Sequence, residues 1–86
     1  MNHYIIEFRT AARKALRRIV EHDRTRILKA IERLADEPYL HGREKLSGEE
    51  GLWRIRVGDY RVIYTVVQNR LVVVVVTIGH RREVYR

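Results

Sequence analysis

The sequence contains no cysteine and only one proline, and its four histidines stand far apart. Without cysteine the chain cannot form a disulfide and offers no thiolate as a metal ligand or a nucleophile, which fits a reducing cytosol. The histidines lack the short spacing of metal ligands; they are His3, His22, His41 and His80. We therefore expect no metal and no other cofactor.

Long apolar runs and a secretion signal are also missing. The longest apolar run, residues 71–78, is far shorter than the roughly 20 residues that span a membrane. The N-terminus has no cationic segment followed by an apolar core, as a signal peptide would. We expect one cytoplasmic domain over residues 1–86, without membrane contact.

Arginine is the residue type in excess, and it is unevenly distributed. The net charge is +7, with 11 Lys/Arg against 9 Asp/Glu in residues 1–50 and 7 against 2 in residues 51–86. All cations of the second half are arginines, which bind phosphate through two parallel hydrogen bonds and stack on bases. This distribution favours a nucleic-acid partner, although an acidic protein partner would suit the same charge.

The first half of the chain predicts a strand followed by two helices. Residues 4–9 suit a strand, and Thr10 can cap a helix whose apolar stripe is Ala12, Ala15, Leu16, Ile19 and Val20. We expect His22 and Asp23 to break this helix, with Asp23 capping a second one that Pro38 ends. The apolar stripe of the second helix is Ile27, Leu28, Ile31, Leu34 and Ala35.

The two predicted helices carry many basic residues: Arg13, Arg17, Arg18, Arg24, Arg26, Lys29 and Arg33. Because Glu21, Glu32 and Asp36 are interspersed among them, we interpret these positions mostly as a solvated helix surface rather than a binding site.

The second half predicts a polar loop and three strands. The loop covers residues 37–50, and the strands cover residues 52–57, 60–67 and 71–78. The last strand is apolar on both faces, which places it inside the sheet. The order β-α-α-β-β-β predicts an α+β fold, with a two-helix hairpin packed on one face of a mainly antiparallel four-stranded sheet.

The first two of these strands form a hairpin that divides its side chains by chemistry. Gly58 and Asp59 suit a two-residue turn, which sets Arg56 opposite Arg61. One face then carries Trp53, Ile55, Val57, Tyr60, Val62 and Tyr64, a core face, and the other carries Arg54, Arg56, Arg61 and Ile63. Opposed like charges are destabilising, so we expect an anion between the arginines, unless they are solvated or lean on Asp59 and a glutamate. By this interpretation Arg61→Ala would leave the fold as stable as before.

Three segments together resemble the RelE/ParE toxin superfamily, and its RelE branch more than its ParE branch. They are KLSG at residues 45–48, LWRIRVGDYRVIY at residues 52–64 and GHRREVY at residues 79–85. The resemblance covers the whole chain. RelE-like proteins are toxins of bacterial and archaeal toxin–antitoxin pairs that cleave messenger RNA in the ribosomal decoding site without a metal. ParE-like relatives share the fold but inhibit DNA gyrase.

The resemblance implies a set of catalytic residues: Arg54, Arg56, Arg61, Arg81 and Tyr85. Lys45 and Arg82 join the arginines as predicted ligands of RNA phosphates. One departure from the family pattern is that Arg54 and Arg56 stand where characterised members often have lysines.

Metal-free RNA cleavage requires a base for the 2′-hydroxyl, stabilisation of the charged phosphorus and a proton for the leaving oxygen. Arginine suits the second role but does not readily release a proton to become a base. We therefore assign the base to Tyr85, because neighbouring arginines favour a phenolate; packing or base stacking would equally suit a tyrosine there. His80 is a second candidate, since imidazole exchanges protons near neutral pH.

These observations predict a ribosome-dependent messenger RNA endoribonuclease that a cognate antitoxin silences and that reaches operator DNA only through the antitoxin complex. A ParE-like inhibitor of gyrase is the rival hypothesis, and it would not need the five residues to act together. A third possibility is a toxin-derived domain that binds only antitoxin and operator DNA.

Overall fold

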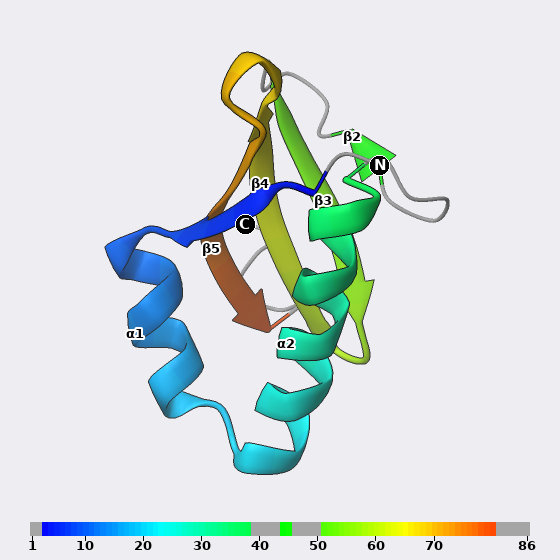
Figure 1. Cartoon of the computed structure of the whole chain (residues 1–86). Helices are drawn as coiled ribbons and strands as arrows, with labels where there is room; N and C mark the ends of the chain where they lie inside the picture. The colour runs from blue at the N-terminus through cyan, green and yellow to red at the C-terminus, as the bar shows by residue number, and fades with distance from the viewer. Residues whose placement is uncertain (1–2, 39–43, 46–50, 81–86) are drawn as a thin grey trace.

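The computed structural model describes residues 3–38, 44–45 and 51–80 and shows an α+β fold (Figure 1). Its elements in chain order are β1 (Ile5–Phe8), α1 (Thr10–Arg18), α2 (Glu21–Asp36), β2 (Glu44–Lys45), β3 (Leu52–Val57), β4 (Tyr60–Val67), the 3-10 turn η1 (Gln68–Arg70) and β5 (Val72–His80). The predicted class and the order of the main elements are confirmed. No helix in the described ranges is long and apolar enough to cross a membrane.

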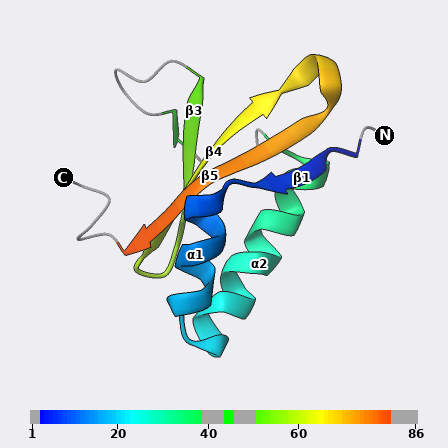
Figure 2. The ribbon, with the colours of Figure 1, turned by 90° about the vertical axis from the view of Figure 1, so that its left-hand side faces the viewer.

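The strands form one mixed sheet in the order β1-β5-β4-β3-β2. β1 lies parallel to β5, while the other neighbours are antiparallel. β5 is therefore interior, as its apolar composition predicts. Both helices lie on the same face of the sheet (Figures 1 and 2).

A short strand within the predicted polar loop adds to the four expected strands. β2 consists of Glu44, which pairs with Arg54, and Lys45, which pairs with Trp53. Two polar residues carry no alternation of apolar and polar positions, so the sequence offers no signal for this strand.

The break between the helices comes earlier than predicted. Ile19 and Val20 both have extended backbone, with ψ angles of 136° and 152°, and both are β-branched, a side-chain type that favours extended conformations. α2 then begins at Glu21 rather than after Asp23. Val20 is 65% exposed, so its predicted place in the apolar stripe of the first helix is wrong.

Neither predicted helix cap is observed. Thr10 is the first residue of α1 and follows an extended Arg9, and no side chain caps either helix N-terminus. Asp23 lies instead in the first turn of α2 together with Glu21. Carboxylates in this turn stabilise the helix by interacting with the positive end of its dipole.

Arg24 ties the two helices together. Its Nη1 donates hydrogen bonds to the main-chain oxygens of Leu16, at 3.5 Å, and Ile19, at 3.2 Å. Because the last carbonyls of a helix have no partner within the helix, this contact stabilises the C-terminal end of α1. Arg24 therefore has a structural role and does not belong to the solvated surface predicted for the helix cations.

The helices cover two apolar clusters. The first contains Ala12, Ile19, Ile27, Ile31, Val62, Val75 and Ile78, and the second contains Tyr4, Leu34, Tyr64 and Val73. Trp53 packs against the second cluster and is partly buried, which agrees with its predicted place on the core face. Leu28 is 37% exposed, whereas the other residues of its predicted stripe are buried.

A β-bulge explains how β5 contributes to both clusters. Ile63 pairs with Thr77 but the next residue, Tyr64, pairs with Val75. The extra residue in β5 shifts the alternation of its side chains. As a result Val75 and Ile78, three positions apart, point to the same helix-covered face.

We expect Tyr64→Phe to lower the free energy of unfolding by about 1–3 kcal/mol. The Tyr64 hydroxyl donates a buried hydrogen bond of 2.8 Å to the main-chain oxygen of Pro38, and phenylalanine would leave that oxygen without this donor. Urea unfolding measures the change. Tyr60→Phe is the control, because Tyr60 is partly exposed and should change stability by less than about 0.5 kcal/mol. Equal effects of the two substitutions would contradict this role for the hydrogen bond.

Candidate nucleic-acid interface

The hairpin of β3 and β4 has the predicted register. Arg56 pairs with Arg61 and Arg54 pairs with Ile63. Gly58 adopts a φ of +60°, a left-handed value that glycine tolerates without strain, and with Asp59 it forms the two-residue turn. The two arginines are therefore directly opposed on adjacent strands.

The separation of the hairpin into two faces is also confirmed. The six predicted core residues of β3 and β4 either belong to the two clusters or pack against them. Because side chains alternate along a strand, Arg54, Arg56 and Arg61 point to the opposite side of the sheet, away from the helices. We call this side, with its three arginines, the arginine face.

The arginine face is not evenly exposed to solvent. Arg56 is exposed and Arg54 is partly buried, but Arg61 is only 2% exposed and is among the largest fully buried side chains. The adjacent Ile63 is 5% exposed. The alternative in which Arg61 is solvated is therefore wrong, because alternation assigns a residue to a face but does not show what covers that face.

Burial changes what Arg61 can do. Its partner in β5 is Gly79, which has no side chain to compete for the space between the strands. A guanidinium held by packing has few orientations available, so it is organised before a ligand arrives. Burial also argues against the expectation that Arg61→Ala leaves stability unchanged. Because alanine would remove most of a buried side chain, we expect this substitution to lower the free energy of unfolding.

His80 lies on the other side of the sheet from the arginines. It pairs with Tyr60, and the two rings form an edge-to-face contact with centroids 5.5 Å apart. Tyr60 belongs to the helix-covered face. The structure therefore does not bring His80 to the arginine face, which argues against it as the base.

The remaining predicted site residues are placed only in part. The backbone of Lys45 lies in β2 beside β3, near the strand that carries Arg54 and Arg56. Arg81, Arg82 and Tyr85 lie outside the described residues. Their assignment to the site stays a prediction.

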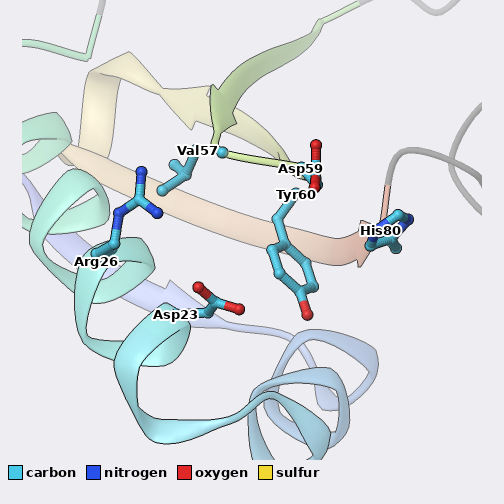
Figure 3. A pocket seen from close by; sticks show the side chains of 7 residues that line it. Asp23, Arg26, Val57, Asp59, Tyr60 and His80 are labelled. Carbon is cyan, nitrogen blue, oxygen red and sulfur yellow. The ribbon is translucent and has the colours of Figure 1, made fainter.

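A pocket that the sequence does not predict lies between α2 and the hairpin turn (Figure 3). It has a volume of ≈ 220 Å³, and its lining includes Asp23, Arg26, Asp59, Tyr60 and His80. Figure 3 shows the Tyr60 ring extending from the hairpin toward Asp23. The two lining residues of α2, Asp23 and Arg26, are more than thirty positions from the turn in the chain, so no local pattern could have predicted the pocket.

The chemistry available on the arginine face is binding and stabilisation of anions. Arg54 and Arg56 can hold phosphate oxygens with charge-assisted hydrogen bonds, and the buried Arg61 adds a further positive charge to this face. None of the three readily serves as a proton acceptor. In the described ranges no cluster of three or more His, Asp or Glu side chains could hold a metal ion. The geometry of the arginine face therefore suits the binding and electrostatic stabilisation of an anion.

Comparison with known proteins places this fold and hairpin in a family. The sequence model of the ParE toxin of the type II toxin–antitoxin system, parDE, matches residues 6–85. Toxin RelG of Mycobacterium tuberculosis (strain ATCC 25618 / H37Rv) is 30% identical over 88 residues, which cover 96% of this chain and 97% of RelG.

Two solved structures show the same similarity in three dimensions. The toxin of the archaeal RelE-RelB complex from Pyrococcus horikoshii OT3 superimposes with a TM-score of 0.80 at 30% identity, covering 94% of this chain and 97% of that chain. The isolated E. coli RelE toxin gives a TM-score of 0.80 at 28% identity, covering 95% and 90%. The chain belongs to the RelE/ParE superfamily of toxins from type II toxin–antitoxin systems, and within it to the RelE-like branch.

Proposed function

We propose that this toxin is a metal-independent endoribonuclease that cleaves messenger RNA on the ribosome and so inhibits translation. The observation that carries the proposal is the opposition of the buried Arg61 to Arg56, with Arg54 on the same face. Guanidinium groups opposed on adjacent strands can act together on one anion, because each carries several N–H donors and a full positive charge. An RNA phosphate passing through the transition state of cleavage is such an anion.

The roles of the residues follow from their chemistry. Arg54, Arg56 and Arg61 stabilise the negative charge that develops on the phosphate, with Arg81, Arg82 and Lys45 contributing further phosphate contacts. Tyr85 removes the proton of the 2′-hydroxyl. This set is poor in acid–base groups, so alignment of the RNA by the ribosome supplies much of the rate enhancement, because orientation alone can contribute several kcal/mol.

A cognate antitoxin is the proposed regulator. The related Pyrococcus horikoshii structure is a RelE-RelB complex. For this chain we propose that an antitoxin segment occupies the arginine face or holds the C-terminal residues, because a basic phosphate site is readily blocked by an acidic or amphipathic segment. Contact with operator DNA would then occur only through the complex.

The inhibition of gyrase is the second candidate, because the matching family description is that of the ParE toxin. A protein inhibitor of that type would not require opposed arginines on the sheet. The arginine face therefore favours the nuclease.

Primer extension on a translated message after induction of the toxin is the direct test. We expect discrete cuts within codons that depend on translation. A non-translated copy of the same message is the control. Intact messages accompanied by cleaved or relaxed DNA would favour inhibition of gyrase instead.

A further inference from the structure

The two opposed arginines of the hairpin are held unequally. Arg61 is buried, and its strand β4 lies between β3 and β5. Arg56 is exposed, and among the described residues β3 has a neighbour on its other side only at Trp53 and Arg54. The end of β3 that carries Arg56 is therefore supported by one strand, and strand ends of this kind open most readily. The position of the Arg56 side chain thus depends on what steadies the adjacent turn.

The side chain of Arg26 extends from α2 to this turn (Figure 3). A Cβ atom built on Gly58 would lie 3.4 Å from Nη1, 3.6 Å from Nη2 and 3.8 Å from Cζ of Arg26. Because these three atoms of a planar group lie at similar distances, the guanidinium presents its face to the turn rather than a single N–H group. Gly58, which has no side chain, leaves this space to the guanidinium.

The surroundings of Arg26 indicate packing rather than the binding of an anion. Asp23, in the first turn of α2, and Asp59, in the hairpin turn, line the same pocket. Their two negative charges exceed the single positive charge of Arg26 and disfavour a phosphate there. Within the described ranges Arg26 forms no hydrogen bond or ion pair. Its contact with the turn is therefore one of shape.

We propose that Arg26 is a positioning residue for RNA cleavage, which packs on Gly58, fixes the hairpin turn and so sets the direction from which Arg56 reaches the phosphate. This inference rests on the proposed ribonuclease function. Arg26 itself does not touch RNA. Arg61 needs no such support, because burial already fixes its side chain. A small displacement of a charge-stabilising group lowers the rate steeply, so loss of the contact should reduce catalysis through Arg56.

The test is a double-mutant cycle of Arg26→Ala and Arg56→Met, measured as single-turnover cleavage on programmed ribosomes. We expect Arg26→Ala to slow cleavage at saturating toxin about 5–20-fold, with the half-saturating toxin concentration within about twofold of the parent. In the Arg56→Met background the same substitution should slow cleavage by less than about twofold further, because the group that it positions is already absent. Losses that multiply in the double variant, or a loss seen only as weaker binding, would indicate a separate RNA contact and overturn the proposal.

Arg33→Ala is the matched control, because it removes an exposed arginine of the same helix that does not line the pocket. It should cleave within about twofold of the parent, since a distant exposed charge is screened by salt. Both Arg26→Ala and Arg33→Ala change exposed side chains and should melt close to the parent. Equal losses of cleavage in the two variants would make the charge of α2, and not the contact with the turn, responsible and would refute the inference.

NMR relaxation of backbone amides separates this inference from the proposed function, because it requires no RNA. The order parameters of Gly58 and Asp59 should fall in Arg26→Ala and stay at the parent values in Arg33→Ala. Unchanged order parameters in Arg26→Ala would mean that the contact does not fix the turn, and the inference would fail. If the parent toxin cleaves nothing while these order parameters still fall, the nuclease proposal fails, whereas the support of the turn by Arg26 stands.

Discussion

Arg61→Met is expected to reduce messenger RNA cleavage by roughly 10²–10³-fold while costing less stability than Arg61→Ala. Arg61 is 2% exposed and faces Arg56 across the hairpin. Methionine fills much of the space of the arginine stem without its charge, so it limits the cavity that a smaller side chain would leave. The substitution also removes the repulsion from Arg56. Single-turnover cleavage on programmed ribosomes and urea unfolding measure the two effects.

Three further substitutions show which property of Arg61 matters. Arg61→Lys keeps the charge but loses the planar fork that binds phosphate through two hydrogen bonds, so it should recover only part of the activity. Arg61→Ala should destabilise the protein by about 2–4 kcal/mol, because it leaves a cavity. Arg56→Met removes the same charge from an exposed position and should change stability little. An Arg61→Met protein that cleaves normally but unfolds readily would mean that Arg61 is structural and not part of the RNA site.

The hairpin could be predicted from the sequence because its signals are local. The glycine at position 58 fixes the turn, and the alternation from Trp53 to Tyr64 fixes the two faces; both are seen in the structure. Once the turn is placed, the opposition of Arg56 and Arg61 follows from register alone. The pairing of Arg56 with Arg61 could therefore be predicted from the sequence alone.

Two of the errors concern features that depend on distant parts of the chain, and one concerns the main-chain conformation between the two helices. The burial of Arg61 and the partial exposure of Leu28 are set by what packs nearby in three dimensions. The helix break at Ile19 and Val20 interrupts an apolar stripe that continues in the sequence, so periodicity alone carried the first helix too far. These are cases in which tertiary packing and main-chain geometry override a local pattern.

A shift of one residue in the pairing of β4 with β5 decides whether His80 can belong to the site. It follows directly after Gly79, the partner of Arg61, so its position in the sequence suggests that it is close to the site. Alternation along β5 places the two residues on opposite sides of the sheet, and the bulge opposite Ile63 and Tyr64 sets which side each one takes. A bulge of one residue is not visible in a run of valines. The sequence therefore could not show that His80, the second candidate for the base, lies on the side of the sheet opposite the arginines.

Tyr85→Phe is expected to slow single-turnover cleavage on programmed ribosomes by roughly 10²–10⁴-fold, the usual contribution of a positioned general base, with little change in ribosome affinity. His80→Gln is the matched comparison, and it should cleave at nearly the parent rate because the His80 ring lies against Tyr60 on the helix-covered side. If Tyr85 only stacks on a base, phenylalanine will stack equally well and the rate will hardly change. A severe defect in His80→Gln combined with a normal Tyr85→Phe rate would transfer the role to His80. Normal rates in both variants would leave the arginines and the geometry imposed by the ribosome as the main source of catalysis, because neither candidate base would then contribute to the rate.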